Sequence, residues 1–106
     1  MTKPPERKVL ATPRFLKSKR RLPPEVQTEI DKRVGGLREN PLAGELKKGP
    51  LKDVRVVKFS AGDRQYLLAY YFRSKPNEIE MLEVGVHEKF YESLTRRIKG
   101  RLRVKD

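Results

Sequence analysis

Residues 65–72 have the sequence QYLLAYYF, a nearly continuous run of apolar and aromatic side chains. Such a run over the length of a strand predicts a central β-strand that is covered on both faces. Residues 53–59 (DVRVVKF) and 78–85 (EIEMLEVG) predict a strand on either side of it, and the connections at 60–64 and 73–77 have the length of hairpin loops. These segments together predict an antiparallel three-stranded meander.

The third predicted strand alternates in part, which predicts the side chains that face the core. Because successive side chains of a strand point to opposite faces, the apolar and acidic positions are expected on opposite sides. The residues expected inside are Ile79, Met81 and Val84, and those expected outside are Glu78, Glu80 and Glu83.

Two helices are predicted before the meander. Thr12-Pro13 predicts the start of the first, with Thr12 as the N-cap, and its inward-facing residues are expected to be Phe15, Leu16 and Leu22. The second begins near Pro24, kinks or ends at Gly35-Gly36 and does not pass Asn40-Pro41. Its apolar face consists of Val26, Ile30, Val34 and Leu37.

A third helix is predicted over residues 88–99, with Phe90, Leu94 and Ile98 buried and Gly100 just past its end. Residues 8–11 predict a short strand. The fold class is therefore α+β, an N-terminal helical hairpin packed on a small antiparallel β-sheet with a C-terminal helix. We expect a flexible basic arm at 1–7, a single domain at 8–100 and a basic tail at 101–106.

The net charge of +12 is unevenly distributed over the 106 residues. Residues 1–24 hold eight basic residues and one acidic residue, residues 95–106 hold six and one, and the segment between them is neutral. Within that segment, residues 45–76 hold eight basic and three acidic residues. A patchy basic surface favours a polyanionic partner, above all nucleic acid. Its candidate substrate-binding residues are Lys47, Lys48, Lys52, Arg20 and Arg21.

Several classes of function are excluded by the composition. The absence of cysteine excludes disulfides, Cys-ligated metal sites and thiol catalysis, and a single histidine excludes a multi-histidine metal site. The sequence has no nucleotide-binding glycine loop and no apolar run of the length that a membrane helix needs. We expect a cytoplasmic protein without metal or cofactor.

The remaining candidates for chemistry are cations and a phenol near the predicted sheet. Arg55 and Lys58 lie on the first meander strand, Arg64 precedes the second, and His87 and Tyr91 follow the last, four residues apart. This set suits metal-independent cleavage of RNA, which needs a base, an acid and positive charge on the phosphate. Each residue also has a structural alternative, as a turn residue, a core-edge aromatic or a solvated charge.

The spacing of Arg55 and Lys58 bears on this set. Residues three apart on a regular strand point to opposite faces, so a bulge would be needed to bring the two side chains together.

Three further stretches resemble a known family: Asn40-Pro41 with residues 46–49 (LKKG), the strand pair at 54–70, and residues 85–91 (GVHEKFY). In this order they are similar to toxins of the RelE/ParE superfamily, from type II toxin–antitoxin systems, and residues 85–91 resemble the RelE-like branch. The resemblance covers residues 9–98. It implies the RelE fold and an antitoxin that covers the active site.

RelE-like toxins cut mRNA on the ribosome without metal, which inhibits translation. The resemblance implies that Arg64, with Arg55 or Lys58, binds the phosphate, that His87 is the general acid, and that Tyr91 orients or activates the 2′-hydroxyl. The general base stays open between Arg55, Lys58, Tyr91 and another group. An acidic antitoxin segment, mRNA and the ribosome are the expected partners, with the toxin a monomer or part of a hetero-oligomer. ParE-like inhibition of DNA gyrase and non-catalytic binding of RNA or ribosomes are the alternatives.

Overall fold

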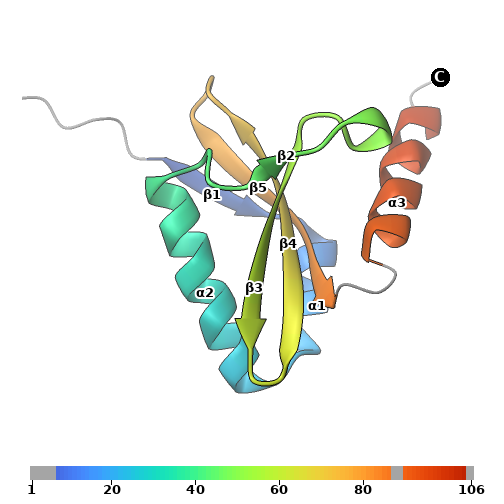
Figure 1. Cartoon of the computed structure of the whole chain (residues 1–106). Coiled ribbons are helices and arrows are strands. Elements are labelled where there is room, and N and C mark those ends of the chain that lie inside the picture. The colour runs from blue at the N-terminus through green and yellow to red at the C-terminus, as the bar shows by residue number, and fades with distance from the viewer. Residues whose placement is uncertain (1–6, 87–89, 105–106) are drawn as a thin grey trace, which may run out of the picture.

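The computed structural model describes residues 7–86 and 90–104, and the side chains among them up to residue 98. Its elements are drawn in Figure 1. In chain order they are β1 (Lys8–Ala11), α1 (Pro13–Arg20), α2 (Pro24–Glu39), β2 (Glu45–Leu46), the 3₁₀ turn η1 (Gly49–Leu51), β3 (Val54–Ala61), β4 (Arg64–Arg73), β5 (Glu78–Val86) and α3 (Phe90–Val104).

The five strands form one sheet in the order β1-β5-β4-β3-β2. The predicted meander is confirmed, since β3 pairs with β4 and β4 with β5 in antiparallel register. β1 lies parallel to β5, with Val9 opposite Ile79, so the sheet is mixed and not purely antiparallel. The two-residue strand β2 pairs antiparallel with β3, in a segment for which the sequence predicts no strand.

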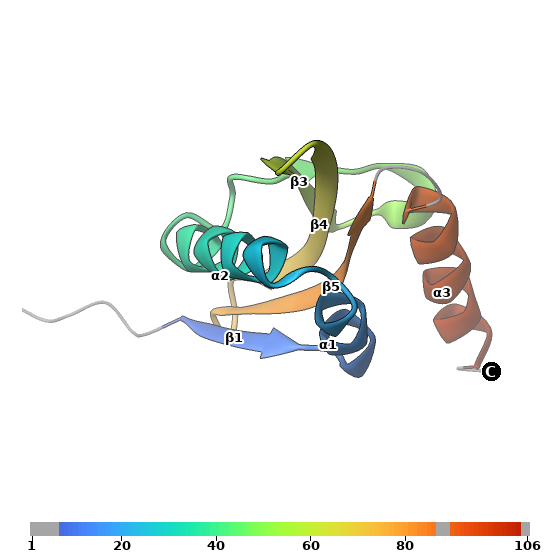
Figure 2. The same cartoon turned by 90° about the horizontal axis from the view of Figure 1, so that it is seen from below.

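Helices cover both faces of the sheet, as Figure 2 shows, with α2 on one side of the strands and α3 on the other. One core lies under α1 and α2 and includes Phe15, Ile30, Leu68 and Tyr70. The second lies under α3 and includes Phe90 and Leu94, both predicted to be buried. β4 contributes to both cores, which explains why its sequence is apolar at nearly every position.

The helix boundaries follow the sequence only in part. The Thr12 hydroxyl accepts a hydrogen bond from the Phe15 N–H at 3.1 Å, so the predicted N-cap is confirmed. Leu16 is 46% exposed, and its expected burial is wrong. α2 continues through Gly35-Gly36 to Glu39, and α3 continues through Gly100 to Val104. Glycine lowers helix stability by only about 1 kcal/mol, which packing of the apolar faces outweighs.

Glu83 was expected to face solvent and is 5% exposed instead. The register between β4 and β5 shifts at this point: Ala69 pairs with Glu83, while Tyr70 pairs with Met81, so that Leu82 is an extra residue on β5. This β-bulge interrupts the alternation and places the Glu83 side chain on the face of Ala69, where Arg97 of α3 contacts its carboxylate.

None of the helices among the described residues has both the length and the apolar character needed to cross a membrane.

Candidate functional site

Two of the predicted cations and the predicted phenol surround one hollow on the α3 side of the sheet. It has a volume of about 330 Å³, and we call it the basic hollow. β2 and β3 form its floor and α3 one wall. Its lining residues are Ala43, Glu45, Lys47, Val56, Val57, Lys58 and Tyr91.

Strand pairing explains why these residues share one face. Glu45 lies opposite Val56 in the β2–β3 pair, and the Lys47 N–H donates to the Val54 carbonyl at 2.9 Å. Side chains that are paired or two residues apart point to the same face, so Glu45, Lys47 and Lys58 all project toward α3. Tyr91 reaches the same place from the first turn of α3.

The charges in the basic hollow are coupled. Lys47 Nζ lies 2.5 Å from Glu45 Oε1 and 5.2 Å from the centre of the Tyr91 ring. The hydrogen bond from Lys47 and the charges of Lys47 and Lys58 hold the pKa of Glu45 below its ordinary value. The Glu45 carboxylate, and to a smaller extent the Tyr91 hydroxyl, hold the pKa of Lys47 above its ordinary value. The Lys47 ammonium and the Glu45 carboxylate are therefore both charged at neutral pH.

Glu45 was not singled out in the sequence. A lone glutamate between a glycine and a leucine has no motif that marks it. The signal is its position opposite Val56, which places a carboxylate beside two lysines.

Arg55 lies on the opposite face of the sheet from Lys58. The β3–β4 register is regular from Val54 to Ala61, so no bulge brings the two side chains together. Arg55 Nη1 donates to the carbonyl oxygens of Gly44 at 2.9 Å and Leu42 at 3.4 Å. Arg55 thus contacts the loop before β2 from behind and does not enter the basic hollow.

Tyr70 holds the same loop from its place beside Arg55 in the sheet. Its hydroxyl donates to the Pro41 carbonyl at 2.7 Å and accepts from the Gly44 N–H at 2.9 Å, and both bonds are buried. Burial raises the pKa of Tyr70, although the Gly44 N–H and the charge of Arg55 act in the other direction. A Cβ on Gly44 would lie 2.7 Å from the Tyr70 Oη, so the fit requires glycine there. Arg55 and Tyr70 together fix the segment that carries Glu45 and Lys47.

The other predicted site residues lie outside the basic hollow. Arg64 is exposed at the start of β4, at the hairpin end opposite Ala61. Lys48 and Lys52 are exposed on either side of η1, and Arg20 and Arg21 are exposed at the end of α1. His87 lies outside the described residues. No cluster of three carboxylate or histidine side chains that could hold a metal ion occurs within residues 7–86 and 90–104.

Comparison with known proteins supports the fold and the family. The family model of ParE-like toxins of type II bacterial toxin–antitoxin systems matches residues 9–95. A search among curated proteins gave no match.

Several solved structures are similar to this chain. A variant of the toxin RelE from Escherichia coli in the free state is 24% identical, with a TM-score of 0.71 over 88% of this chain and 98% of that one. The toxin–antitoxin complex RelBE2 from Mycobacterium tuberculosis contains a chain that is 19% identical, with a TM-score of 0.69 over 77% of this chain and 99% of that one. The isolated E. coli RelE toxin is 25% identical, with a TM-score of 0.63 over 87% of this chain and 98% of that one. The resemblance in fold therefore extends over 98–99% of each solved chain and 77–88% of this one.

Proposed function

Because the chain belongs to the family of ParE-like toxins of type II bacterial toxin–antitoxin systems, we propose that it is a metal-independent endoribonuclease that cuts mRNA on the ribosome and inhibits translation. The observation that carries this proposal is the basic hollow, where Lys47, Lys58, Glu45 and Tyr91 converge from three elements. Two ammonium groups beside a carboxylate and a phenol provide phosphate binding and proton transfer at one place.

The proposed reaction is attack by a ribose 2′-oxygen on the adjacent phosphorus. The 2′-oxygen gives its proton to a base and forms a bond to phosphorus, while the bond from phosphorus to the 5′-oxygen breaks. The 5′-oxygen then takes a proton from an acid. The products are a 2′,3′-cyclic phosphate and a 5′-hydroxyl, and no oxidant or metal enters the balance.

Residues are assigned to these steps by their charge state at neutral pH. Lys58 and Lys47 are ammonium groups and stabilise the negative charge that develops on the phosphate. Glu45 is ionised, because its pKa is lowered by the lysines, and its carboxylate oxygen is proposed to accept the 2′-proton. Tyr91 orients the 2′-hydroxyl. In the proposal His87 keeps its predicted role as the general acid that protonates the leaving 5′-oxygen, and Arg64 keeps its predicted role as a phosphate ligand.

We place the antitoxin over the same hollow. An acidic segment of the antitoxin would pair with Lys47 and Lys58 and occupy the place of the phosphate. This arrangement would keep the toxin inactive in the cytoplasm until the antitoxin is lost.

The test compares Lys58→Met with Lys75→Met after induction in bacterial cells. Both variants lose one exposed lysine, but Lys75 lies in the turn between β4 and β5, away from the hollow. Pulse-labelling of protein synthesis is expected to stop within minutes for wild type and Lys75→Met and to continue for Lys58→Met. Equal toxicity of the two variants would contradict the proposal.

The match to the ParE-like model favours inhibition of DNA gyrase as a second candidate. It predicts DNA damage while protein synthesis continues at first. The same pulse-labelling, with DNA synthesis followed in parallel, separates the two functions.

A further inference from the structure

A second cavity lies on the other face of the sheet, between α2 and the outer edge of β3. Its volume is about 450 Å³, larger than that of the basic hollow, and we call it the α2 groove. Ala43 and Val57 line both cavities, so the α2 groove and the basic hollow meet at the edge of β3. The other residues that line the α2 groove include Lys32, Arg33, Gly36 and Leu37.

The edge of β3 between the two cavities carries unpaired backbone groups. The pairing of β2 with β3 extends no further along β3 than Val56. Because the Lys47 N–H donates to the Val54 carbonyl, the backbone groups of Val54 point toward β2. These groups alternate in direction along an antiparallel strand, so the N–H and C=O of Lys58 and Ser60 point the same way. No strand of the described chain pairs with them on that side, and they form an open sheet edge.

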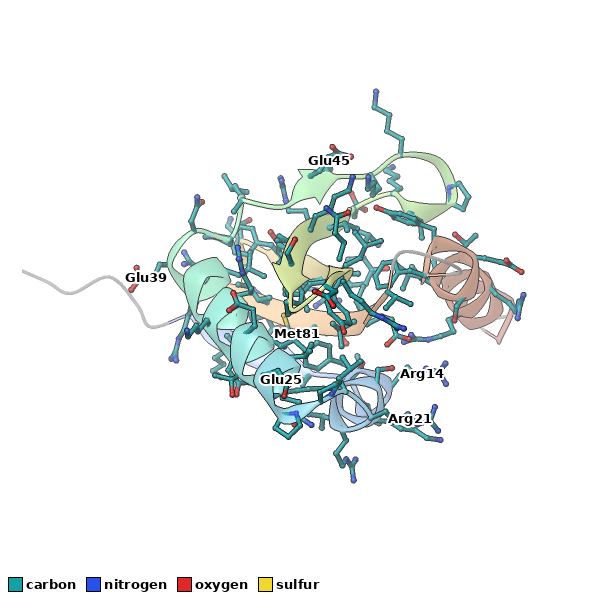
Figure 3. All side chains as sticks on the ribbon, turned by 60° about the horizontal axis from the view of Figure 1, so that its bottom comes forward. Arg14, Arg21, Glu25, Glu39, Glu45 and Met81 are labelled. Atoms are coloured by element: carbon teal, nitrogen blue, oxygen red, sulfur yellow. The ribbon has the colours of Figure 1, made fainter. Side chains whose placement is uncertain are left out.

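The loop before β2 leaves this edge free. The Gly44 N–H donates to the Tyr70 hydroxyl at 2.9 Å, so the chain at Gly44 does not continue the pairing with β3. Figure 3 shows the two ends of the loop, Glu39 at the end of α2 and Glu45 on β2. Residues 57–61 of β3 are therefore open to a strand from another chain.

Gly36 keeps the α2 groove wide, although glycine destabilises the interior of a helix. No Cβ is excluded there, because nothing lies within 4 Å of one built at Gly36. Positive φ does not require glycine either, since the described glycines with positive φ are Gly49 and Gly62. The open space above Gly36 belongs to the α2 groove. Such a glycine suits a place where another chain approaches the helix backbone closely.

We propose that an extended acidic segment of a partner protein adds to the open edge of β3 as a further strand, antiparallel to β3 as β2 is. Successive side chains of a strand point to opposite faces of the sheet. Those on one face enter the α2 groove beside Leu37 and Val57, and those on the other enter the basic hollow beside Lys58. The segment therefore alternates between apolar and acidic residues. The inference deepens the proposed function and rests on it for the partner, since in this way the antitoxin covers the basic hollow.

Charge and chemistry favour a protein segment of this kind over RNA or a second copy of the chain. Lys32 and Lys58 are exposed on the two sides of the edge, and the net charge of +12 opposes self-association. Glu29 also lines the α2 groove, but its carboxylate is paired with Arg33 at 2.9 Å. Open N–H and C=O groups of a sheet edge match the backbone of a peptide, which RNA does not have.

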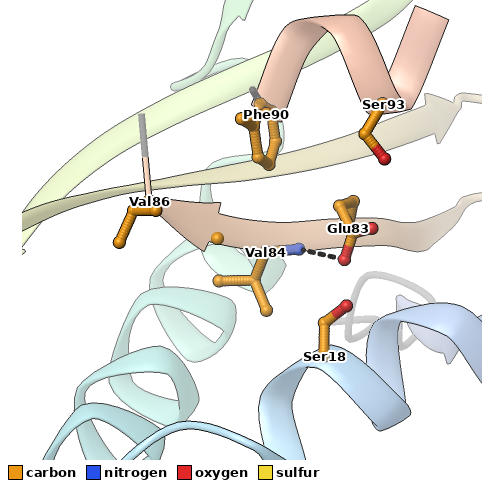
Figure 4. A pocket seen from close by; sticks show the side chains of 7 residues that line it. Ser18, Glu83, Val84, Val86, Phe90 and Ser93 are labelled. Atoms are coloured by element: carbon orange, nitrogen blue, oxygen red, sulfur yellow. Dashed lines mark hydrogen bonds between the residues drawn. The ribbon is translucent and has the colours of Figure 1, made fainter. Parts of the chain in front are cut away.

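The cavity between α1 and α3 is less suited to this segment. Its volume is about 190 Å³, less than half that of the α2 groove. Figure 4 shows Ser18 of α1 and Ser93 of α3 on either side of Glu83 of β5. β5 is an inner strand in the order β1-β5-β4-β3-β2, whereas an added strand needs an edge strand.

The first test measures binding of a fluorescent twelve-residue peptide of alternating valine and glutamate by anisotropy. A peptide of the same composition, with valines and glutamates in successive pairs, is the control. The alternating peptide is expected to bind about tenfold more tightly, because only it directs every valine to one face.

N-methylated peptides test the strand pairing itself. Opposite residues of an antiparallel pair share a face, so glutamates lie opposite Lys58 and Ser60 and exchange hydrogen bonds with them. N-methylation of the glutamates is expected to abolish binding, because their N–H groups donate to the edge of β3. N-methylation of the valines is expected to weaken it by less than about threefold, because their N–H groups point away.

The second test compares Gly36→Gln with Gly35→Gln. The control is matched, because Gly35 also lies within α2 and has nothing within 4 Å of a Cβ, but does not line the α2 groove. Glutamine favours a helix more than glycine does, so both variants are expected to melt about 3 °C above wild type. Gly36→Gln is expected to weaken binding of the alternating peptide about tenfold, because its side chain fills the groove. Gly35→Gln is expected to weaken it by less than about twofold.

Equal binding of the alternating and paired peptides, or equal effects of the two glycine substitutions, would overturn the proposal. So would a Gly36→Gln variant that binds the peptide normally but binds a 2′-O-methyl RNA more weakly, which would assign the groove to RNA. A wild-type dimer in sedimentation that Gly36→Gln dissociates would assign the edge to a second copy instead. If wild type binds the alternating peptide but cuts no mRNA, the proposed function fails while the strand site stands. If it cuts mRNA but does not bind this peptide, the strand site fails alone.

Discussion

Replacing Tyr70 by phenylalanine removes the hydroxyl that holds the loop before β2, which leads to Glu45 and Lys47 of the basic hollow. The hydroxyl donates to the Pro41 carbonyl and accepts from the Gly44 N–H, and both bonds are buried. An unpaired buried polar group costs roughly 1–3 kcal/mol. We expect a loss of about 2–6 kcal/mol in the free energy of unfolding, because two groups lose their partner. For a chain of this size, the melting temperature would fall on the order of 10 °C.

The same substitution is expected to slow RNA cleavage by about tenfold or more, since small displacements of reacting groups are costly. The loop held by Tyr70 leads directly into β2, which carries Glu45, and on to Lys47. Once the loop is released on one side, these side chains lose their fixed position over β3. The bonds from Arg55 remain and limit the displacement.

Tyr71→Phe is the matched control, because it removes the same atom from the next residue of β4. The Tyr71 hydroxyl has no hydrogen-bond partner among the described residues, and its ring stacks under Arg73 at 5.2 Å. We expect Tyr71→Phe to change stability by less than about 0.5 kcal/mol. Urea unfolding and single-turnover cleavage of both variants provide the comparison. If Tyr70→Phe is as stable and as active as Tyr71→Phe, the reasoning about the loop is refuted.

Four further predictions concern the stability of the folded protein. Gly44→Ala should destabilise the protein more than Gly35→Ala in thermal melts, because a Cβ at Gly44 would meet Tyr70 Oη at 2.7 Å, while nothing lies within 4 Å of one at Gly35. Stability should fall above pH 10 and fall less in Tyr70→Phe: burial raises the pKa of Tyr70 above its ordinary 10.0, so the unfolded chain loses this proton first. Thr12→Val should lower the free energy of unfolding, measured in urea, by about 1 kcal/mol, because the N-cap hydrogen bond is lost. Glu83→Gln should lower the free energy of unfolding, measured in urea, by about 3 kcal/mol, because two arginines would lose a buried charged partner.

The strands and helices could be predicted because each has a hydrophobic period of its own. The run at 65–72 and the spacing of Phe90 and Leu94 are local patterns, and the structure buries residues 66–70, Phe90 and Leu94 in the two cores. The strand β2 could not be predicted, since its two residues form a strand only by pairing with β3. For the same reason Glu45 was missed, although it is one of the charged residues of the hollow.

Glu83 shows how a local rule fails at a bulge. The charge of Glu83 predicts an outward side chain, whereas strict alternation would place it on the face of Ile79 and Met81. The extra residue Leu82 moves it to the face of Ala69, where Arg97 of α3 contacts it. A bulge depends on the register with the neighbouring strand, which no pattern within one strand reveals. For Arg55 and Lys58 the alternation rule is correct, since β3 is regular and the two side chains point to opposite faces. The sequence left open whether a bulge brings the two side chains together, and the regular pairing with β4 shows that none does.

The most direct test of the proposed activity is the single-turnover rate at which the protein cuts mRNA bound to purified bacterial ribosomes. We expect wild type and Lys75→Met to produce fragments that end in a 2′,3′-cyclic phosphate at similar rates. Lys58→Met is expected to be slower by about a hundredfold, because a group that stabilises the charged phosphate is lost. Its stability should be unchanged, since Lys58 is exposed. Absence of cleavage by wild type, or cleavage by Lys58→Met at the wild-type rate, would contradict the proposal that the basic hollow is the active site.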